Sequence, residues 1–509
     1  MLAIIDSVAL LGLDGQRVRV EVDVTHGLPG WDIVGLPDIA VRESKDRVRS
    51  AIKNSFMDYP IQRITVNLAP ADLRKEGPVY DLPIAVGILA ATGQVNPELT
   101  NEMLFIGELS LDGSLRGVHG VLPLVMAARD LGIKKVIVPL DNAAEAALVR
   151  DVEVFGLTNL VELSGALRGE TKLIPFSLEE LTTAHSDGVG LDFADVRGQL
   201  AAKRAMEIAA AGGHNILMLG SPGCGKTMLA RRLPSILPEL SFEESLEVTK
   251  IYSLAGQLPA KNPLIRQRPF RSPHHTSSTA SLVGGGRIPK PGEISLAHYG
   301  ILFMDEIPEF HKDSLEALRQ PLEDGCVSVS RVAASFTFPA NIMLVGAANP
   351  CPCGYQLDKE KECTCTPHQA QKYINRISGP LLDRIDIHLE VPKISYEELN
   401  NVPPGESSVD IKARVEKARS IQRERFNKSS LACNAAMGAR EVRKYCRTDA
   451  AGAKLLQEAF KRMGLSARSH DRILKVARTI ADLAGSEHLS ANHLAEAIQY
   501  RSLDRILRS

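Results

Sequence analysis

The chain has 509 residues, a formal net charge of −1 at pH 7 and eight cysteines. This length suggests roughly two to four domains with ample hydrophobic core, and the balanced charge means that any nucleic-acid surface must be a local basic patch. No apolar run approaches the about 18 residues of a membrane span, so we expect no membrane contact. The first residues lack the basic segment of a signal peptide, and we expect a reducing, cytoplasmic setting for the cysteines.

Residues 1–165 are predicted to form a self-contained α+β domain, followed by a linker at 166–190 with few apolar runs. A hairpin with an Asp-Gly turn is expected at 107–117. Mixed strands and helices account for the remainder. The expected strands are 17–22, 63–68 and 135–139, and the expected helices are 40–54, 82–91 and 121–131.

The stretch Lys75-Glu76-Gly77-Pro78, the hairpin and the helix and strand after it resemble the Lon-protease-type domain, which has the ribosomal protein S5 domain 2-like fold. The resemblance places the protease's serine at Val79 and its lysine at Leu122. Because neither residue can act as nucleophile or base, we expect a binding or assembly module without peptidase chemistry. Its cations form either a solvated face or a nucleic-acid contact; they are Arg42, Lys45, Arg47, Arg49, Lys53, Arg74 and Lys75.

A glycine-rich stretch lies between the apolar run 216–219 and a helix-forming segment, with the pattern G-x-x-x-x-G-K-T. Glycines let backbone N–H groups turn inward around a phosphate. Lys226 can reach the β- and γ-phosphates of ATP, and the Thr227 hydroxyl can hold Mg²⁺. The alternative is a chance glycine turn, which the flanking strand and helix disfavour. The predicted ATP-binding residues are Gly220, Ser221, Pro222, Gly223, Cys224, Gly225, Lys226, Thr227 and Met228.

A second apolar run, 300–304, ends in the carboxylates Asp305 and Glu306. Downstream of a phosphate loop, this pattern predicts that Asp305 holds Mg²⁺ and that Glu306 orients and activates the attacking water. A third strand, 341–348, ends at Asn349, which can contact the γ-phosphate or the water. The alternative for Asn349 is an ordinary turn residue before a proline.

Four cysteines follow Asn349 in two C-x-C pairs: Cys351, Cys353, Cys363 and Cys365. Four thiolates this close can hold one tetrahedral Zn²⁺, and a Cys₄ set leaves no open position, so the metal would be structural. The alternative is four incidental buried cysteines. His368 is a substitute ligand.

The order of these elements resembles AAA+ ATPases, with a core at 191–394 and a helical lid at 395–509. The resemblance implies that Val196 and Gly198 flank the adenine. It also implies that Arg384 reaches into a neighbouring subunit's site and neutralises charge on the γ-phosphate, with Arg376 in reserve. Arg468 is placed like the lid arginine that touches the γ-phosphate of its own subunit, and Arg472 competes for that role.

An insert rich in glycine and proline occupies about 270–293, and a second hairpin is expected at about 325–340. The neighbouring His274 and His275 invite a metal interpretation, but adjacent side chains on an extended segment point to opposite faces, so we favour a mobile loop. Basic side chains on these two segments are the candidate DNA contacts; they are Arg287, Lys290 and Arg331.

The assembled motifs resemble the YifB/ComM family, the magnesium-chelatase-like AAA+ proteins. The resemblance covers nearly all of the chain and includes both the Lon-like domain and the phosphate loop. Its other motifs are Gly-Gly-Gly-Arg-Ile at 284–288, Asp305-Glu306, Asn-Pro-Cys-Pro-Cys-Gly at 349–354, Leu-Leu-Asp-Arg-Ile-Asp at 381–386 and Ser-Ala-Arg at 466–468.

This resemblance implies a hexameric ring, related to the helix-2-insert clade, that hydrolyses ATP with Mg²⁺. The family's best-known member is a DNA helicase that promotes branch migration during natural transformation, so the implied partners are single-stranded or branched DNA and recombination proteins. The alternative function is a magnesium-chelatase-like ATPase that remodels a protein partner. A Lon-like protease is disfavoured by Val79 and Leu122.

Overall fold

The computed structural model describes residues 1–177, 190–259, 263–286, 290–330, 335–358, 360–394, 405–429, 431–463 and 466–504. The chain divides into two compact units. The first consists of Met1–Ser186 and Phe242–Ile265, and the second of Asp187–Ser241 and Arg266–Ser509. None of the helices in the described part of the chain is long and apolar enough to cross a membrane.

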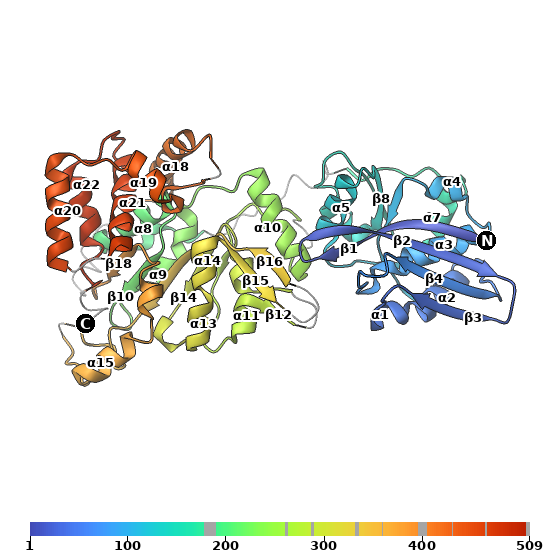
Figure 1. The fold of residues 1–509 in the computed structure, drawn as a ribbon, viewed down its shortest axis with the longest axis horizontal. Helices are drawn as coiled ribbons and strands as arrows, with labels where there is room; N and C mark the ends of the chain where they lie inside the picture. The colour runs from blue at the N-terminus through green and yellow to red at the C-terminus, as the bar shows by residue number, and fades with distance from the viewer. Residues whose placement is uncertain are drawn as a thin grey trace. The chain divides into compact units, whose positions relative to one another are not determined.

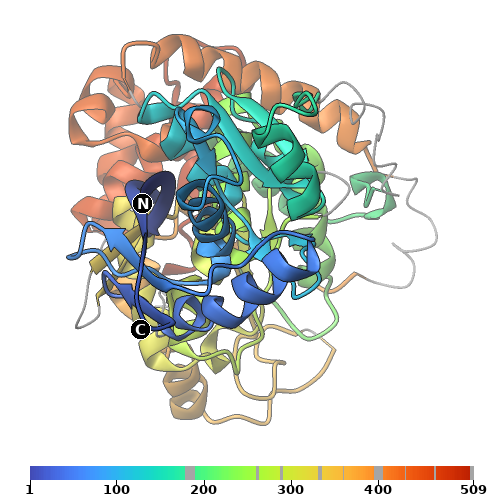
Figure 2. The same ribbon diagram turned by 90° about the vertical axis from the view of Figure 1, so that its right-hand side faces the viewer.

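The first unit is built on a seven-stranded sheet of order β3-β4-β2-β1-β5-β8-β9, drawn in blue and cyan in Figures 1 and 2. β2 pairs antiparallel with β1 and β4, and the remaining pairs are parallel. Burial alternates along β2 and β4, as expected where one face of a sheet covers a core. The strands are β1 (Leu2–Leu11), β2 (Asp14–Thr25), β3 (Gly30–Val34), β4 (Arg63–Ala69), β5 (Met103–Phe105), β8 (Lys135–Pro139) and β9 (Glu153–Leu157).

Helix α3 (Asp81–Ala91) is buried along its whole length and packs on β1 and β2. A helix that is apolar on all sides belongs inside a core, and its sequence predicts this position. The hairpin expected at 107–117 is confirmed as β6 (Glu108–Leu109) and β7 (Leu115–Arg116). The other helices of this unit are α1 (Ile39–Arg42), α2 (Ser44–Asn54), α4 (Pro97–Thr100), α5 (Val121–Asp130), α6 (Leu140–Ala146) and α7 (Leu160–Leu167).

The helix predicted at 40–54 is confirmed except for a break at Glu43, which separates α1 from α2. Asp38 fixes α1 independently: its carboxylate accepts the Val41 N–H at 2.8 Å and the Gly77 N–H at 3.1 Å. The expected cationic face is also smaller than the sequence suggests. Arg47 donates to the buried Asp81 at 2.6 Å, and Lys75 is fully buried against backbone carbonyls.

Helix α10 (Phe242–Ala255) belongs to the first unit although it follows the phosphate loop in sequence. It packs on α5, and the Ser253 carbonyl accepts the Gly120 N–H at 3.1 Å. The Ser253 hydroxyl donates to the Glu145 carboxylate, which also accepts the Leu122 N–H at 2.7 Å. A segment inside the predicted 191–394 range therefore clusters with the N-terminal unit.

The second unit contains a five-stranded parallel sheet of order β11-β14-β17-β10-β18. β10, β14 and β17 are buried at every residue, which explains their uninterrupted apolar sequences. Parallel strands end at the same edge, so the segments after β10, β14 and β17 meet there. The strands are β10 (Ile216–Leu219), β11 (Phe270–Arg271), β14 (Ile301–Met304), β17 (Met343–Ala348) and β18 (Ile387–Glu390).

Short helices and two hairpins surround this sheet. The insert forms α11 (Thr279–Val283) and the small hairpin of β12 (Gly284–Gly285) and β13 (Lys290–Pro291). The second hairpin is confirmed as β15 (Cys326–Ser330) and β16 (Ser335–Pro339). The helices are α8 (Leu200–Gly212), α9 (Lys226–Arg232), α12 (Glu293–Leu296), α13 (Lys312–Ala317), α14 (Arg319–Asp324), α15 (Pro367–Ile374) and α16 (Gly379–Leu382).

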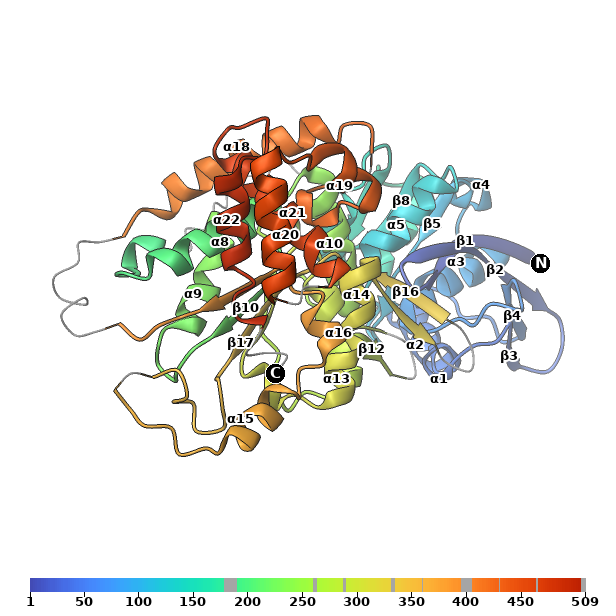
Figure 3. The same cartoon turned by 60° about the vertical axis from the view of Figure 1, so that its left-hand side comes forward.

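The C-terminal segment is helical, as predicted, and Figure 3 shows its helices in orange and red. These helices share one hydrophobic core with α8 and the sheet. Buried polar contacts fix this lid to the strand β18. Asp386 receives bonds from Arg472 and from the Asn215 N–H, and His388 lies 2.7 Å from Asp504. The lid helices are α18 (Ser408–Arg425), α19 (Ala439–Tyr445), α20 (Ala450–Met463), α21 (Ala467–Leu483) and α22 (Ala491–Gln499).

Candidate nucleotide-binding and metal sites

The glycine-rich stretch forms a tight loop between β10 and α9. Gly223 and Gly225 have φ angles of 78° and 96°, a region that favours glycine. A side chain at Gly220 would meet the Val391 carbonyl oxygen at 2.4 Å. The backbone of this loop therefore requires glycine at these positions.

Lys226 lies at the centre of this loop with 8% of its surface exposed. Its ammonium donates to the carbonyls of Gly220 at 2.6 Å and Ser221 at 3.1 Å, and to the Asn349 side-chain oxygen at 3.2 Å. Asn349 directly follows β17. The structure thus brings together two predicted residues that are far apart in sequence, at the place where a γ-phosphate would bind.

Thr227 and Asp305 also meet, with the threonine hydroxyl donating to the carboxylate at 2.8 Å. Hydroxyl and carboxylate oxygens are ligands that Mg²⁺ prefers, so this pair fits the predicted metal position. Glu306 follows with a left-handed φ of 50°, and its half-exposed carboxylate lies 3.6 Å from His275 Nδ1. The sequence singled out His275 in the insert, but no local signal linked it to Glu306.

The predicted adenine-flanking segment lies against the same loop. Val196 is fully buried, and its carbonyl accepts a bond from the Lys203 ammonium. Gly198 has a φ of 62°. The next side chain, Gln199, donates to the Cys224 carbonyl at 3.5 Å and to the Pro392 carbonyl at 2.5 Å. Residues 196–199 therefore connect the phosphate loop with the end of β18.

Comparison with known proteins agrees with this geometry. Family models of the magnesium chelatase subunit ChlI match residues 20–142 and 192–399, and a model of its C-terminal part matches 405–501. Competence protein ComM of Haemophilus influenzae is 46% identical over 512 residues, covering 100% of this chain and 99% of the relative. The chain belongs to the YifB/ComM family of magnesium-chelatase-like AAA+ ATPases.

Two further relatives show how much of the chain each likeness covers. The uncharacterized protein YifB of Escherichia coli is 46% identical over 507 residues, covering 99% of this chain and 98% of the relative. Lon protease 2 of Bacillus subtilis is 26% identical over 166 residues, covering 30% of this chain and 29% of the relative. The YifB/ComM likeness thus spans the whole chain, whereas the Lon likeness is partial.

In this YifB/ComM chain the four cysteines gather after β17. The sulfur atoms of Cys351, Cys353, Cys363 and Cys365 all lie within 4.8 Å of one another. Three of the S–S separations are 3.3, 3.6 and 3.7 Å, close to the about 3.8 Å that Zn–S bonds of about 2.3 Å give in a tetrahedron. Backbone hydrogen bonding from Tyr355 lowers the pKa of Cys353 to about 5. The donor set therefore fits Zn²⁺, and His368 is not one of the grouped residues.

The cysteine loop packs directly on the phosphate loop. A side chain at Gly354 would meet the Pro222 ring at 2.6 Å, so the two loops touch. The Ser221 hydroxyl bonds to Asp358 and helps to hold its pKa below the usual range, after backbone bonds from Glu360 and Lys361. The sequence predicted both loops but gave no sign of this contact.

The two predicted arginines, Arg384 and Arg468, contact neither the phosphate loop nor the cysteine loop in the described part of the chain. Arg384 is buried and donates to Glu323 and to the Pro380 carbonyl, while burial and the nearby Arg468 lower its pKa. Arg468 is exposed and lies 4.0 Å from the same Glu323. The two arginines thus share one carboxylate on α14.

The two reserve arginines have other partners. Arg376 is exposed and pairs with Glu309 at 2.8 Å. Arg472 binds the buried Asp386 and fixes α21 to β18. Burial opposes ionisation of Asp386, but Arg472 and His214 outweigh it and hold the pKa of this carboxyl well below its usual range.

Of the candidate DNA contacts, Lys290 is exposed on β13. Arg287 and Arg331 lie outside the described residues.

Proposed function

We propose that the chain is an ATP-driven motor that closes into a hexameric ring and moves DNA, as a helicase that promotes branch migration in recombination. The observation that carries this proposal is the separation of two sets of groups. Lys226, Thr227, Asp305 and Asn349 meet around the phosphate loop. Within the described part of the chain, the contacts of Arg384 and Arg468 involve none of them.

A ring explains that separation. In a closed heterologous ring, each subunit presents one face to the phosphate loop of its neighbour. Arg384 would then neutralise charge on the neighbour's γ-phosphate. Because Arg468 contacts the same Glu323, we assign it to the same face, in place of the role on its own subunit's nucleotide that its sequence position implies.

The chemistry follows from the placement of the remaining groups. Lys226 would exchange its carbonyl partners for phosphate oxygens, and Thr227 and Asp305 would hold Mg²⁺, which neutralises phosphate charge when bound. Glu306 would accept the proton of the water that attacks the γ-phosphorus, and Asn349 would orient that water or the phosphate. Val196 and Gly198 would flank the adenine.

The cysteine cluster is assigned to a structural Zn²⁺. The four thiolates would complete a tetrahedral Zn²⁺ site and leave no position for a substrate. Its place in the proposal is to hold the loop that covers Ser221 and Pro222.

DNA would be held by the insert and the second hairpin through Arg287, Lys290 and Arg331. The relative named as a competence protein supports DNA as the substrate of the motor. The magnesium chelatase family models support the alternative, an ATPase that remodels a protein partner. The two functions differ in whether nucleic acid changes ATP turnover.

The deciding experiment measures the ATPase rate with and without single-stranded or branched DNA at several salt concentrations, with the Lys226→Ala variant as background. We expect stimulation by DNA that falls steeply as salt rises, because phosphate contacts release counterions. An ATPase rate that is insensitive to every DNA, at every salt concentration, would contradict the DNA motor and favour the protein-remodelling alternative.

A further inference from the structure

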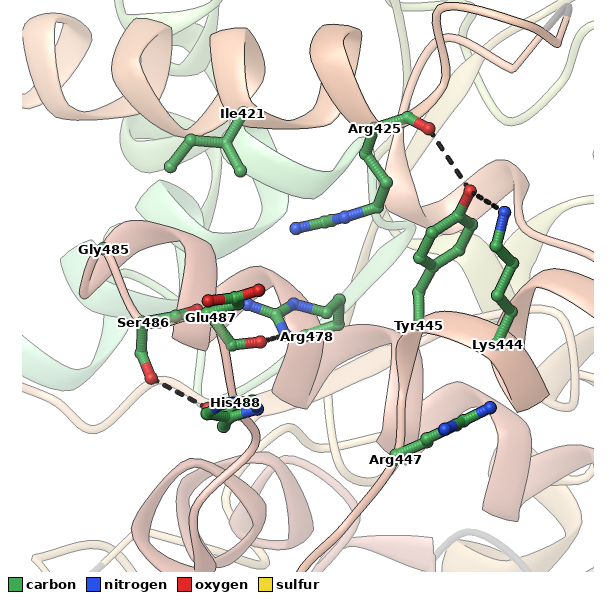
Figure 4. Close-up of a pocket in the computed structure, with 10 residues that line it drawn as sticks. All are labelled: Ile421, Arg425, Lys444, Tyr445, Arg447, Arg478, Gly485, Ser486, Glu487 and His488. Carbon is green, nitrogen blue, oxygen red and sulfur yellow. Dashed lines mark hydrogen bonds between the residues drawn. The ribbon is translucent and has the colours of Figure 1, made fainter.

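The helical lid contains a pocket of about 430 Å³ that is separate from the nucleotide site. It lies between the end of α18, the end of α19 and the turn after α21, as Figure 4 shows. The charged and aromatic side chains that line it are Arg425, Lys444, Tyr445, Arg447, Arg478 and Glu487. A pocket of this volume is large enough for one nucleotide unit.

The inner wall of the pocket is a preformed cationic network. Arg425 and Arg478 both bind the buried carboxylate of Asp482, at 2.7 Å and 3.1 Å. Arg478 also donates to the Glu487 carbonyl at 2.7 Å. Two guanidinium groups share one carboxylate, so this wall carries a net positive charge and its side chains are fixed before any ligand arrives.

The rim of the pocket adds further positive charge, and the Lys444 ammonium donates to the Tyr445 hydroxyl at 2.8 Å and lies 4.6 Å from the centre of the Tyr445 ring. Lys444 and Arg447 are exposed, and neither forms an ion pair with any residue that the structure describes. The only carboxylate among the lining side chains is Glu487. Four cations therefore face two carboxylates, Asp482 included, and the net charge of about +2 favours an anionic ligand.

The third feature is an aromatic wall. The Tyr445 hydroxyl donates to the Arg425 carbonyl at 3.3 Å, and its ring packs edge-on against Phe426 with centroids 5.8 Å apart. These contacts fix the ring beside the cations (Figure 4). A fixed ring next to exposed Lys and Arg side chains is the combination that binds single strands, with a base against the ring and a phosphate on the cations.

We propose that this pocket binds one nucleotide of single-stranded nucleic acid, with the phosphate on Lys444 and Arg447 and the base against Tyr445. The inference rests on the proposed function, and it adds a strand contact in the lid to those expected on the insert. An acidic peptide would use the same cations but would not require the aromatic ring.

The test measures binding of a fluorescently labelled oligo(dT) to the full-length protein by anisotropy across a salt series. Arg447→Ala and Lys444→Ala should each weaken binding about 3- to 10-fold and reduce the salt dependence by about one phosphate contact. Arg443→Ala is the matched control, because it removes an exposed cation that neighbours Lys444 on α19 and does not line the pocket. It should change affinity less than 2-fold.

A second pair of variants tests the ring. Tyr445→Phe keeps the aromatic face and should retain binding, whereas Tyr445→Leu should weaken it about 5-fold or more. Equal effects of Arg447→Ala and Arg443→Ala would overturn the site, because charge alone would then explain binding. Equal binding by the Phe and Leu variants would overturn the nucleotide assignment. Failure of the wild-type protein to bind the oligonucleotide would instead contradict the proposed function itself.

Discussion

Each of the two units carries a loop that resembles a catalytic motif, a protease loop in the first unit and a phosphate loop in the second. Only the phosphate loop has the reactive side chains that its motif requires. In the second unit Lys226, Thr227 and Asp305 meet around the phosphate loop. In the first unit Val79 follows Gly77-Pro78, and Leu122 is fully buried at the position expected for the protease's lysine.

The position of Leu122 has a different use in this chain. Its N–H donates to Glu145, and Glu145 also receives the Ser253 hydroxyl of α10. Helix α10 is the segment between the phosphate-loop helix α9 and the strand β11. The comparison teaches that the position expected for the protease's lysine instead helps, through Glu145, to hold a helix whose sequence lies between two elements of the nucleotide-binding unit.

The largest effect is expected from Lys226→Ala. Removing the ammonium leaves the loop carbonyls and Asn349 without their partner and the phosphates without their main cation. ATP turnover should fall to background in a coupled assay. Lys75→Ala, in the first unit, is a control for loss of a buried lysine that bonds to backbone carbonyls, and turnover should survive it. Persistent turnover in Lys226→Ala would remove Lys226 from the site.

Arg384→Ala should come next. If this arginine acts on a neighbour's γ-phosphate, kcat should fall by roughly 10³-fold while nucleotide binding to the same subunit is retained. Binding of a fluorescent ATP analogue and steady-state turnover separate the two. Arg376→Ala, the exposed alternative, should leave kcat within a few-fold of wild type. A larger loss from Arg376→Ala would reverse the assignment.

Asp386→Asn tests whether the lid is held by charge. The pKa of Asp386 is lower in the folded protein than in the unfolded chain. The ion pair with Arg472 therefore stabilises the fold fully above the ordinary carboxyl pKa of about 4, and this stabilisation is lost as the pH falls toward the pKa of Asp386 in the folded protein. At pH 7 breaking the pair should cost about 3 to 5 kcal/mol, because Arg472 is left unpaired. The difference in unfolding free energy between wild type and variant, measured with denaturant, should therefore narrow progressively as the pH falls below about 4. A pH-independent difference would contradict the ion-pair account.

Loss of the metal site should have a smaller effect. Cys353→Ser, or chelation of the wild type, should loosen the loop on Pro222 and weaken ATP binding about 5-fold, equivalent to roughly 1 kcal/mol. Bound zinc measured by a colorimetric release assay provides an independent readout. Cys433→Ser, outside the cluster, is the control. Unchanged ATP affinity after complete metal release would disprove the coupling between the loops.

The sequence predicts the parts of the second unit whose signals are local. The glycine pattern, the strand ending in Asp305 and the closely spaced cysteines each specify their chemistry within a short window. The contact between Thr227 and Asp305 also follows, because parallel strands end at a common edge.

Other contacts depend on long-range packing and have no periodic signal. Nothing near Ser253 indicates that α10 joins the first unit, and nothing near Gly354 indicates that it touches Pro222. The sharing of Glu323 by Arg384 and Arg468 likewise unites three distant segments. Such contacts depend on the arrangement of elements in space, which sequence spacing does not record.

The central claim is that each ATP site is completed by a neighbouring subunit, and mixing two inactive variants tests it most directly. Lys226→Ala lacks a working phosphate loop but keeps Arg384, and Arg384→Ala has the opposite defect. In a randomly mixed ring about a quarter of the sites would combine both intact halves. The account predicts that the equimolar mixture regains ATPase activity that neither variant has alone. A mixture as inactive as its components, under conditions where subunits exchange, would contradict it.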